Sequence, residues 1–465
     1  MSSLAEKLYA ASPATIQDLG VTLYGLKVYR REYGAKFKRL LEEFERQQWF
    51  SSNELKTYQS LHLAKLVQHA YENVPFYREV MDQRNLTPRD IQSVDDLRKM
   101  PIVTKDVIKA NFQKFLAKNR SPSTFIHGRT SGTTGSPLEL IYDSNVCLVK
   151  NVVDWRQKSI GGIKVGDRHI FVQGRMVVPV DRKKPPFWRK NWILNHLYFS
   201  SFHLSSENLP YYLEALVRFK PKSIEGYPST LNYLARSILA AGIDITLKAA
   251  FMSSEMLLPE QRSTIEAAFH CRVYDFYGMA ERAVFATECD LHNGKHLNDD
   301  FGITEVLAKN GEPAKAGELG RIVVTGLHNY AMPLIRYQSS DVTALNPEAC
   351  ACGRAFPLMH NVTSKDEDVV TTKDGRYISP SLLTHPFKPL TSIQESQVIQ
   401  ESVDLLRVLV VRLPSYTEND TRYLVKELQL RMGAGTKIEI EFVDQIPRTA
   451  NGKFRWVVSK VPVKL

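Results

Sequence analysis

The chain has little that would place it in a membrane or hold it together by disulfides. Its 465 residues contain no run of about 18 consecutive apolar residues, the length that a membrane-spanning helix needs. The first residues, MSSLAEKLYAASPA, lack the apolar core of a secretory signal. Five cysteines in so long a chain do not make a disulfide scaffold. We therefore expect no membrane-spanning helix and a cytoplasmic location.

Two common binding signatures are also missing. The glycine-rich loop at 130–137 does not end in Gly-Lys-Ser/Thr, which excludes a Walker A site. No helix-turn-helix or RNA-binding signature is present, so nucleic acid is not an expected partner. The net charge of +11, from 61 basic and 50 acidic residues, nevertheless favours anionic partners such as nucleotides, coenzyme A or acidic lipid. A basic nucleic-acid-binding protein stays open as one alternative.

Residues 19–46 form a basic, leucine-containing stretch with helical spacing. Such a helix packs its apolar face on its own domain or rests on an anionic membrane surface, as weak peripheral association. Both readings stay open, and the oligomeric state is not indicated by the sequence.

The order of helical and strand patterns predicts an α/β fold with a large multi-layer first domain. The first 120 residues look mainly helical, including 105–119. Further on, helices at 209–219 and 229–241 alternate with apolar runs typical of strands, which favours parallel pairing. The strand candidates are 169–172, 224–227, 273–276 and 321–325.

A polar run at 361–368 divides the chain, and we place the domain boundary there, between 1–363 and 364–465. The second part has its own α+β pattern: an Asp-Gly turn at 374–375, strands at 393–400, 405–412 and 437–442, and a helix at 418–432. It predicts a small mobile lid, with Lys453 in the loop after its last strand.

The loop at 130–137 reads Thr-Ser-Gly-Thr-Thr-Gly-Ser-Pro. Glycines let the backbone approach an anion, and neighbouring N–H and hydroxyl groups can donate to phosphate oxygens. The phosphate-binding candidates are Thr130, Ser131, Gly132, Thr133, Thr134 and Gly135. A flexible surface linker has a similar composition and remains the alternative.

Three later segments supply groups that one nucleotide reaction needs. Glu281, in Tyr-Gly-Met-Ala-Glu, can hold Mg²⁺ against phosphate, and Tyr277 can stack on adenine. Asp341, in Tyr-Gln-Ser-Ser-Asp, can accept from the ribose hydroxyls. Lys453 can neutralise charge that develops at the α-phosphate. Each residue alone also fits an ordinary surface role.

TSGTTGSPLEL, YGMAE, RYQSSD and PRTANGK, in this order, resemble the signature motifs of the adenylate-forming ligase superfamily. HAYENVPFYREV, EGYPST and HNYAMPLIRY are similar to the branch of phenylacetate–CoA ligases and CapK-like capsular polysaccharide proteins. The resemblance implies a catalytic Lys453, Mg²⁺ on Glu281, and ATP held by the 130–135 loop, Tyr277 and Asp341. It also implies that Ser253, Ser254 and Glu255 line the substrate pocket. Lys365 stands where a hinge arginine is common in the superfamily.

The implied reaction joins ATP and a small carboxylate into an acyl-adenylate with release of pyrophosphate. The acyl group then passes to an acceptor, which is the thiol of coenzyme A or an amine or hydroxyl in surface polysaccharide assembly. A scaffold or binding protein that has lost catalysis is the alternative within the same fold, and the sequence does not identify the carboxylate.

Cys289 and Cys350-x-Cys352, with a histidine near the first, suggest a Cys₃His zinc site. His292 and His296 are both candidates. The resemblance favours His296, because it matches a Gly-x-His position seen in some members of the branch. A site with four protein ligands would be structural rather than catalytic. Free, reduced thiols are the other reading.

Overall fold

The computed structural model describes most of the chain. The described residues are 4–130, 138–173, 177–179, 181–205, 207–308, 310–362, 370–373, 377–378, 380–387, 389–390, 392–446 and 455–461. Within them, no helix is long and apolar enough to cross a bilayer.

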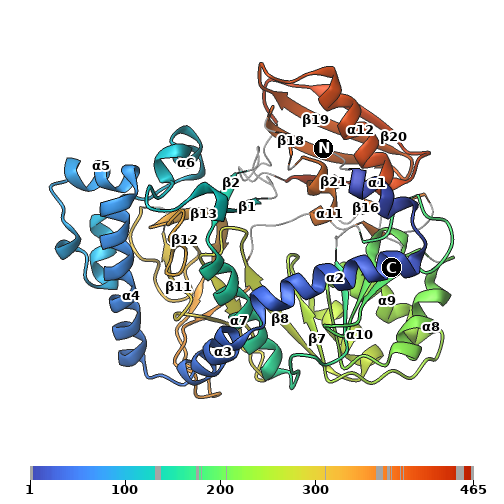
Figure 1. Ribbon diagram of the computed structural model, residues 1–465, viewed down its shortest axis with the longest axis horizontal. Helices are drawn as coiled ribbons and strands as arrows, with labels where there is room; N and C mark the ends of the chain where they lie inside the picture. The colour runs from blue at the N-terminus through green and yellow to red at the C-terminus, as the bar shows by residue number, and fades with distance from the viewer. Residues whose placement is uncertain are drawn as a thin grey trace.

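The first part of the chain is helical, as predicted, and lies at the left and across the front of Figure 1. Its helices are α1 (Leu4–Ala11), α2 (Ala14–Glu32), α3 (Ala35–Gln47), α4 (Ser52–Asn73), α5 (Pro75–Gln83) and α6 (Lys105–Ala110). Short 3₁₀ segments lie between α5 and α6, at Pro88–Asp90 and Val94–Lys99, and after α6, at Phe112–Phe115 and Pro122–Thr124.

The helix expected over 105–119 was predicted too long. At Asn111 the backbone leaves the helical region, and its side-chain amide donates to the Val107 carbonyl at 3.0 Å. An asparagine that bonds to nearby backbone in this way competes with the helix.

A ten-stranded sheet forms the centre of the molecule, in the order β14-β15-β10-β9-β8-β7-β6-β3-β5-β4. Its strands are β3 (His169–Gln173), β4 (Trp188–Asn191), β5 (His196–Ser200), β6 (Ser223–Gly226), β7 (Ala249–Met252), β8 (Arg272–Gly278), β9 (Phe285–Thr287), β10 (Lys295–Leu297), β14 (Leu345–Asn346) and β15 (Leu358–Met359). Only β5, β3, β6, β7 and β8 pair in parallel. The expectation of parallel pairing is therefore right for the middle of the sheet and wrong for its antiparallel ends.

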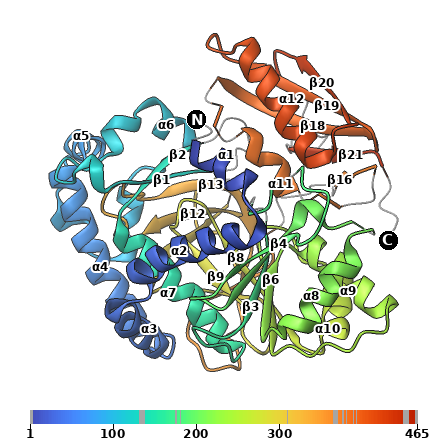
Figure 2. The ribbon, with the colours of Figure 1, turned by 45° about the vertical axis from the view of Figure 1, so that its right-hand side comes forward.

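Helices cover both faces of this sheet, as Figure 2 shows. One apolar core joins it to α8 (Leu209–Phe219), α9 (Pro228–Ala240) and α10 (Pro259–Phe269). The opposite core joins it to α3 and α7 (Ser144–Ile160), through buried residues such as Phe44, Val152 and Phe251. The result is the layered α/β arrangement that the alternation of patterns predicts.

Two smaller sheets complete this part. β1 (Ile126–Arg129) and β2 (Glu139–Tyr142) form an antiparallel pair on either side of residues 131–137. β11 (Gly302–Leu307), β12 (Gly320–Gly326) and β13 (Tyr337–Thr343) form a three-stranded antiparallel sheet. Residues of both sheets pack in one apolar core with α4 and α5. This core includes Tyr337 at the start of β13.

The last part of the chain lies at the upper right in Figure 1. It contains the pair β16 (Val370–Thr371) and β17 (Tyr377–Ile378), with α11 (Pro380–Thr384) and a 3₁₀ turn at His385–Phe387. A four-stranded sheet follows, in the order β20-β19-β18-β21, with α12 (Glu418–Met432) packed on it. Its strands are β18 (Ile393–Ser402), β19 (Leu405–Arg412), β20 (Lys437–Phe442) and β21 (Val457–Ser459).

One prediction about this part was wrong. Strand β21 follows β20 and pairs in parallel with β18, so position 453 falls between the last two strands rather than after the last. The apolar core also contains Phe202 and Tyr227 from the first part, which joins the two parts through buried contacts. The boundary between 363 and 364 lies outside the described residues and stays a prediction.

Candidate active site

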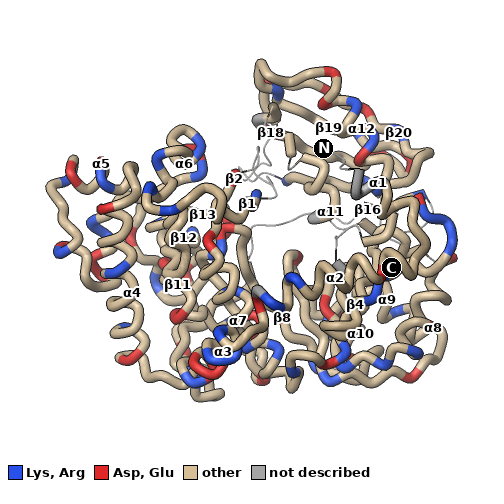
Figure 3. Tube along the Cα trace, viewed as in Figure 1, with Lys and Arg blue, Asp and Glu red and all other residues tan. Residues whose placement is uncertain are grey.

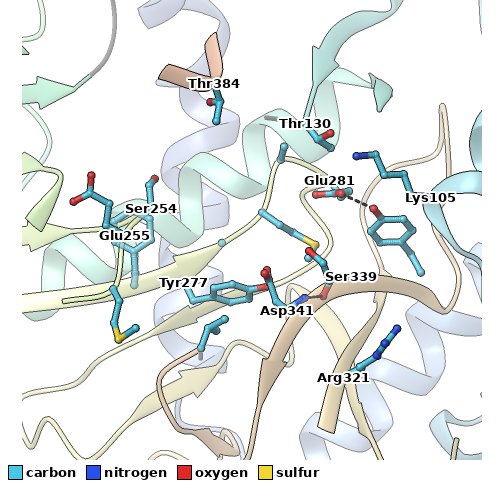
Figure 4. A pocket seen from close by; sticks show the side chains of 18 of the residues that line it. Lys105, Thr130, Ser254, Glu255, Tyr277, Glu281, Arg321, Ser339, Asp341 and Thr384 are labelled. Atoms are coloured by element: carbon cyan, nitrogen blue, oxygen red, sulfur yellow. Dashed lines mark hydrogen bonds between the residues drawn. The ribbon is translucent and has the colours of Figure 1, made fainter. Parts of the chain in front are cut away.

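A cavity of about 620 Å³ lies where the ends of β8 and β13 meet α6 and the segment that carries Thr384 and His385. Strands from the first part and helix α11 from the last part thus line one space. Figure 4 shows the side chains of this cavity, with Thr384 opposite the strands. An opening lined by both parts of the chain can change shape when the two parts move relative to each other.

The cavity collects most of the predicted residues that the structure describes. Its lining includes Thr130, Ser254, Glu255, Tyr277, Glu281 and Asp341. Ser253 is buried and is not one of the lining residues, so its predicted contact with substrate has no support in the geometry. The predicted residues Ser131, Gly132, Thr133, Thr134, Gly135, Lys365 and Lys453 lie outside the described part of the chain.

Two tyrosine–carboxylate pairs connect β8 and its following turn to β13. The Tyr277 hydroxyl donates to Asp341 Oδ2 at 2.6 Å, and the Tyr337 hydroxyl donates to Glu281 Oε1 at 2.8 Å. The Asp341 backbone N–H also donates to Ser339 Oγ at 3.1 Å. Each segment therefore positions the carboxylate of the other. The sequence analysis predicted that Tyr277 stacks on adenine. It did not predict the hydrogen bond between the Tyr277 hydroxyl and Asp341.

Burial controls the electrostatics of these pairs. It raises the pKa of Glu281 above its ordinary value, although the hydrogen bond from Tyr337 acts in the opposite direction. Burial and the nearby Asp341 carboxylate raise the pKa of Tyr277, and burial with Glu281 does the same for Tyr337. Both tyrosines therefore remain neutral donors at any physiological pH. A cation placed beside Glu281 would favour its ionised form.

Lys105 is a cavity residue that the sequence analysis missed. It opens α6, which begins after the Thr104 cap, and the preceding Val103 exchanges backbone hydrogen bonds with the start of β13 at 2.9 Å. Figure 4 shows the Lys105 amino group directed toward Glu281. Burial lowers the pKa of Lys105 to about 8, with the positive charge of Lys109 acting in the same direction. A largely buried lysine that lines the cavity beside Glu281 is a candidate phosphate ligand.

A second polar group in the cavity wall was also missed. Asp275 on β8 forms a buried ion pair with Lys295 on β10, at 2.8 Å, and Lys295 Nζ donates to Asn361 Oδ1 at 2.5 Å. Burial raises the pKa of Asp275 to about 6, and among the described residues its second carboxylate oxygen has no hydrogen-bond partner. The sequence around Asp275 does not predict this ion pair, because Lys295 lies on a strand two positions away in the sheet.

Glu255 has a structural contact in addition to its place in the lining. Its Oε2 accepts from the Ser229 backbone N–H at 3.0 Å, at the first turn of α9. A carboxylate at this end of a helix satisfies a free donor and complements the helix dipole. The residue therefore fixes the cavity wall between β7 and α9, whether or not it also contacts a substrate.

The cysteine and histidine candidates come together in a separate cluster. The ligand atoms of Cys289, His296, Cys350 and Cys352 all lie within 4.8 Å of one another. Cys289 and Cys350 Sγ are 3.7 Å apart, and Cys352 Sγ lies 3.4 Å from His296 Nε2. A tetrahedron with Zn–S bonds of about 2.3 Å has ligands about 3.8 Å apart, so these spacings fit zinc.

The geometry also separates the two histidines. His296 Nδ1 lies 3.2 Å from the Phe356 carbonyl oxygen, which leaves Nε2 to face the cysteines. A second contact of this kind is typical of a histidine that binds a metal. Burial lowers the pKa of His296 to about 4, so its ring is neutral. His292 instead contacts Glu288 at 3.2 Å and lies outside the cluster.

A family model and a curated relative match this chain. The family model described as the CapK C-terminal domain matches residues 370–460. Protein CapK of Staphylococcus aureus is 28% identical over 98% of this chain and 99% of its own length. The resemblance to the CapK-like branch of the adenylate-forming ligases is confirmed.

More distant relatives extend the resemblance to named enzymes. The phenylacetate–coenzyme A ligase of Thermus thermophilus is 26% identical over 68% of this chain and 71% of its own. A crystal structure of 2-hydroxyisobutyryl-CoA ligase, in complex with an acyl-adenylate and CoA, has a TM-score of 0.56 at 21% identity. That match covers 88% of this chain and 91% of the other, and it confirms the predicted fold class.

Proposed function

We propose that this CapK-like protein is an ATP-dependent, AMP-forming carboxylate ligase. The observation that carries the proposal is the single cavity that contains Tyr277, Glu281 and Asp341 together with Lys105 and Thr130. Similarity to phenylacetate–CoA ligases supports a ligase of the adenylate-forming type. The individual residue roles rest on the geometry and on the motifs.

In the first step, a carboxylate oxygen of the substrate attacks the α-phosphorus of ATP. The bond from that phosphorus to the bridging oxygen breaks, and pyrophosphate leaves with its electron pair. Such a transfer depends mainly on alignment and on neutralising charge. Asp341 would accept from the ribose hydroxyls, and Lys105 and Lys453 would face the phosphates.

Glu281 would hold Mg²⁺, because carboxylate oxygens suit this hard cation and only Oε1 is engaged by Tyr337. Bound there, the ion would offset negative charge on the phosphates. Tyr337 keeps the carboxylate turned toward the cavity while the Tyr277 contact keeps Asp341 in place. Thr130 marks the start of the loop proposed to hold the β- and γ-phosphates, and its own backbone N–H donates to the Leu138 carbonyl at 3.0 Å.

In the second step, an acceptor attacks the acyl carbon, loses its proton, and AMP leaves. The acceptor is the thiol of coenzyme A, or an amine or hydroxyl group. We propose that residues 364–465 act as a lid that brings Lys453 to the cavity for the first step and withdraws it for the second. Support comes from Thr384 and His385, which place the last part of the chain at the cavity.

We further propose that Cys289, His296, Cys350 and Cys352 hold a structural Zn²⁺. All four positions of a tetrahedral ion would then be filled by protein, which leaves none for a substrate. The ion would join the β9–β10 turn to the segment after β14, and so support the sheet beside the cavity.

The test of the function is ATP–pyrophosphate exchange by the full chain with a panel of carboxylic acids. Products with coenzyme A, or with amine and hydroxyl acceptors, are then identified by mass spectrometry. Exchange with at least one acid, abolished in Glu281→Ala, is the expected result. ATP binding without exchange for any acid would instead favour a scaffold that has lost catalysis.

A further inference from the structure

Helix α2 turns several large apolar side chains outward and buries polar and small residues against β4, although Val28 near its end packs on the core that α3 and α7 share. Gln17, Thr22 and Gly25 are on its buried side. On its outer side, Ile16, Leu19 and Leu23 are 55%, 50% and 59% exposed. A surface helix of a globular domain normally has the opposite arrangement.

The inward contacts are specific, so the helix is not simply loosely attached. Gln17 Nε2 donates to the Tyr9 carbonyl at 2.7 Å, and Gln17 Oε1 accepts from Arg189 Nε at 2.6 Å. Thr22 Oγ1 accepts from the Trp192 backbone N–H at 3.3 Å. At Gly25, a Cβ would lie 2.0 Å from Asn191 Nδ2, so only glycine allows this close approach. These contacts fix the rotation of α2 against β4.

Other apolar side chains enlarge the outer surface. Tyr24, on the next position of α2, is 64% exposed. Trp192 and Ile193, which follow β4 beside Thr22, are 47% and 37% exposed. Leu8 on α1 is 61% exposed. Large exposed apolar side chains on neighbouring elements are typical of an interaction site.

The same outer stripe of α2 becomes basic toward its end. Positions 16, 19, 23, 27 and 30 follow one another at spacings of three and four, so they share one face of the helix. The last two are Lys27 and Arg30, which are both exposed. Figure 3 shows positive residues on the half of α2 nearer to α3. No acidic residue occupies any of these five positions.

We propose that this face, formed by Ile16, Leu19, Leu23, Lys27 and Arg30, docks on an anionic lipid bilayer. A helix that lies in the plane of the bilayer inserts apolar side chains among the acyl chains and places basic ones at acidic headgroups. A second copy of this chain is a poorer occupant. A two-fold contact through the same face would add a second set of uncompensated basic residues to the interface.

The inference is independent of the enzymatic proposal, because none of these residues lines the cavity. For the α2 part of residues 19–46, it takes up the membrane-surface reading that the sequence left open. Phe37 and Phe44 of α3 do pack on the protein, whereas Leu23 of α2 faces outward.

The experiment is sedimentation of the full chain with vesicles, either of phosphatidylcholine alone or of equal parts phosphatidylcholine and phosphatidylglycerol. The wild type should bind the anionic vesicles, and added salt should weaken the binding. Leu19→Ser with Leu23→Ser should lower the partition coefficient roughly 20-fold. Lys27→Gln with Arg30→Gln should lower it about tenfold or more, on anionic vesicles only.

The matched control is Leu61→Ser with Leu239→Ser, because these leucines are 54% and 48% exposed on other helices. The control should bind as the wild type does, and melting temperatures would verify that each variant is folded. The proposal is overturned if the wild type does not bind anionic vesicles or if the α2 variants match the control. A dimer that dissociates in the leucine variant, without vesicle binding, would identify a second copy as the occupant. Should the leucine variant not fold, the charge variant alone decides.

Discussion

Replacing Lys105 by methionine is expected to stabilise the protein and at the same time to impair adenylation. Burial lowers the pKa of this lysine from 10.5 to about 8. At about 1.4 kcal/mol per pKa unit, keeping the charged side chain in the folded protein costs at most about 3.5 kcal/mol. Methionine has a similar length and no charge, so the variant should regain part of that free energy of unfolding.

The pH dependence follows from the direction of the shift. Between pH 8 and pH 10.5, the unfolded chain still holds the Lys105 proton while the folded chain has released it. The free energy of unfolding of the wild type therefore rises with pH over this window. Chemical denaturation at pH 7 and at pH 10 should show the advantage of the Lys105→Met variant at the lower pH and a smaller advantage at the higher one.

Activity should change in the opposite direction. Loss of a charge-assisted contact to phosphate, worth about 1.5–3 kcal/mol, lowers kcat/KM for ATP roughly 10- to 150-fold. The wild-type rate should also fall at alkaline pH as Lys105 loses its proton, and the variant should lack this fall. Both are measured by ATP–pyrophosphate exchange across pH.

Lys109→Met is the matched control. Lys109 lies on the same helix, burial also lowers its pKa, and it is not one of the cavity-lining residues. It should gain some stability without losing activity. A Lys105→Met variant with the wild-type exchange rate and pH profile would refute the proposed role of Lys105.

Four further outcomes are expected. Asp341→Asn should weaken ATP binding by about 1.5–3 kcal/mol in calorimetry, and unchanged binding would remove the ribose assignment. Lys453→Ala should nearly abolish pyrophosphate exchange while ATP still binds, because this lysine acts mainly on the transition state; a normal exchange rate would exclude it. Asp275→Asn should change the substrate preference of the enzyme. The ratio of kcat/KM for hydroxyl-bearing acids to kcat/KM for their apolar analogues should fall roughly tenfold or more, because an apolar substrate leaves the buried Asp275 carboxylate without a hydrogen-bonding partner. An unchanged ratio would contradict this. Cys352→Ser should lower zinc content and melting temperature together, and metal-free protein of normal stability would support free thiols.

Local sequence patterns predicted the regular elements well. The helices α8 and α12 and the strands β19 and β20 have the expected bounds. Each has a clear hydrophobic period and a recognisable end, such as Gly433 after α12. The pairing of β16 with β17 fits the predicted hairpin, whose Asp-Gly turn at 374–375 lies outside the described residues.

Long-range contacts were beyond what the local patterns contain. Lys105 reaches the cavity only because Val103 pairs with the beginning of β13, more than 200 positions later in the chain. Asp275 acquires its role from Lys295, which comes from another strand of the sheet. The outward leucines of α2 likewise depend on Arg189 and Asn191, which demand polar and small partners. In contrast, the cluster of cysteines and histidine was predictable from the sequence, because cysteines at the spacing of zinc ligands are rare.

The reciprocal contacts between Tyr277 and Asp341 and between Tyr337 and Glu281 have a thermodynamic consequence. In both segments the tyrosine precedes the carboxylate by four positions, and each hydrogen bond crosses to the other segment. The effects of substitutions in the two segments should therefore be non-additive, with a coupling free energy that a double-mutant cycle can measure. The two motifs are separate in the sequence but would then be inherited as one unit. Loss of the first motif removes the tyrosine that donates to Asp341, and loss of the second removes the tyrosine that donates to Glu281.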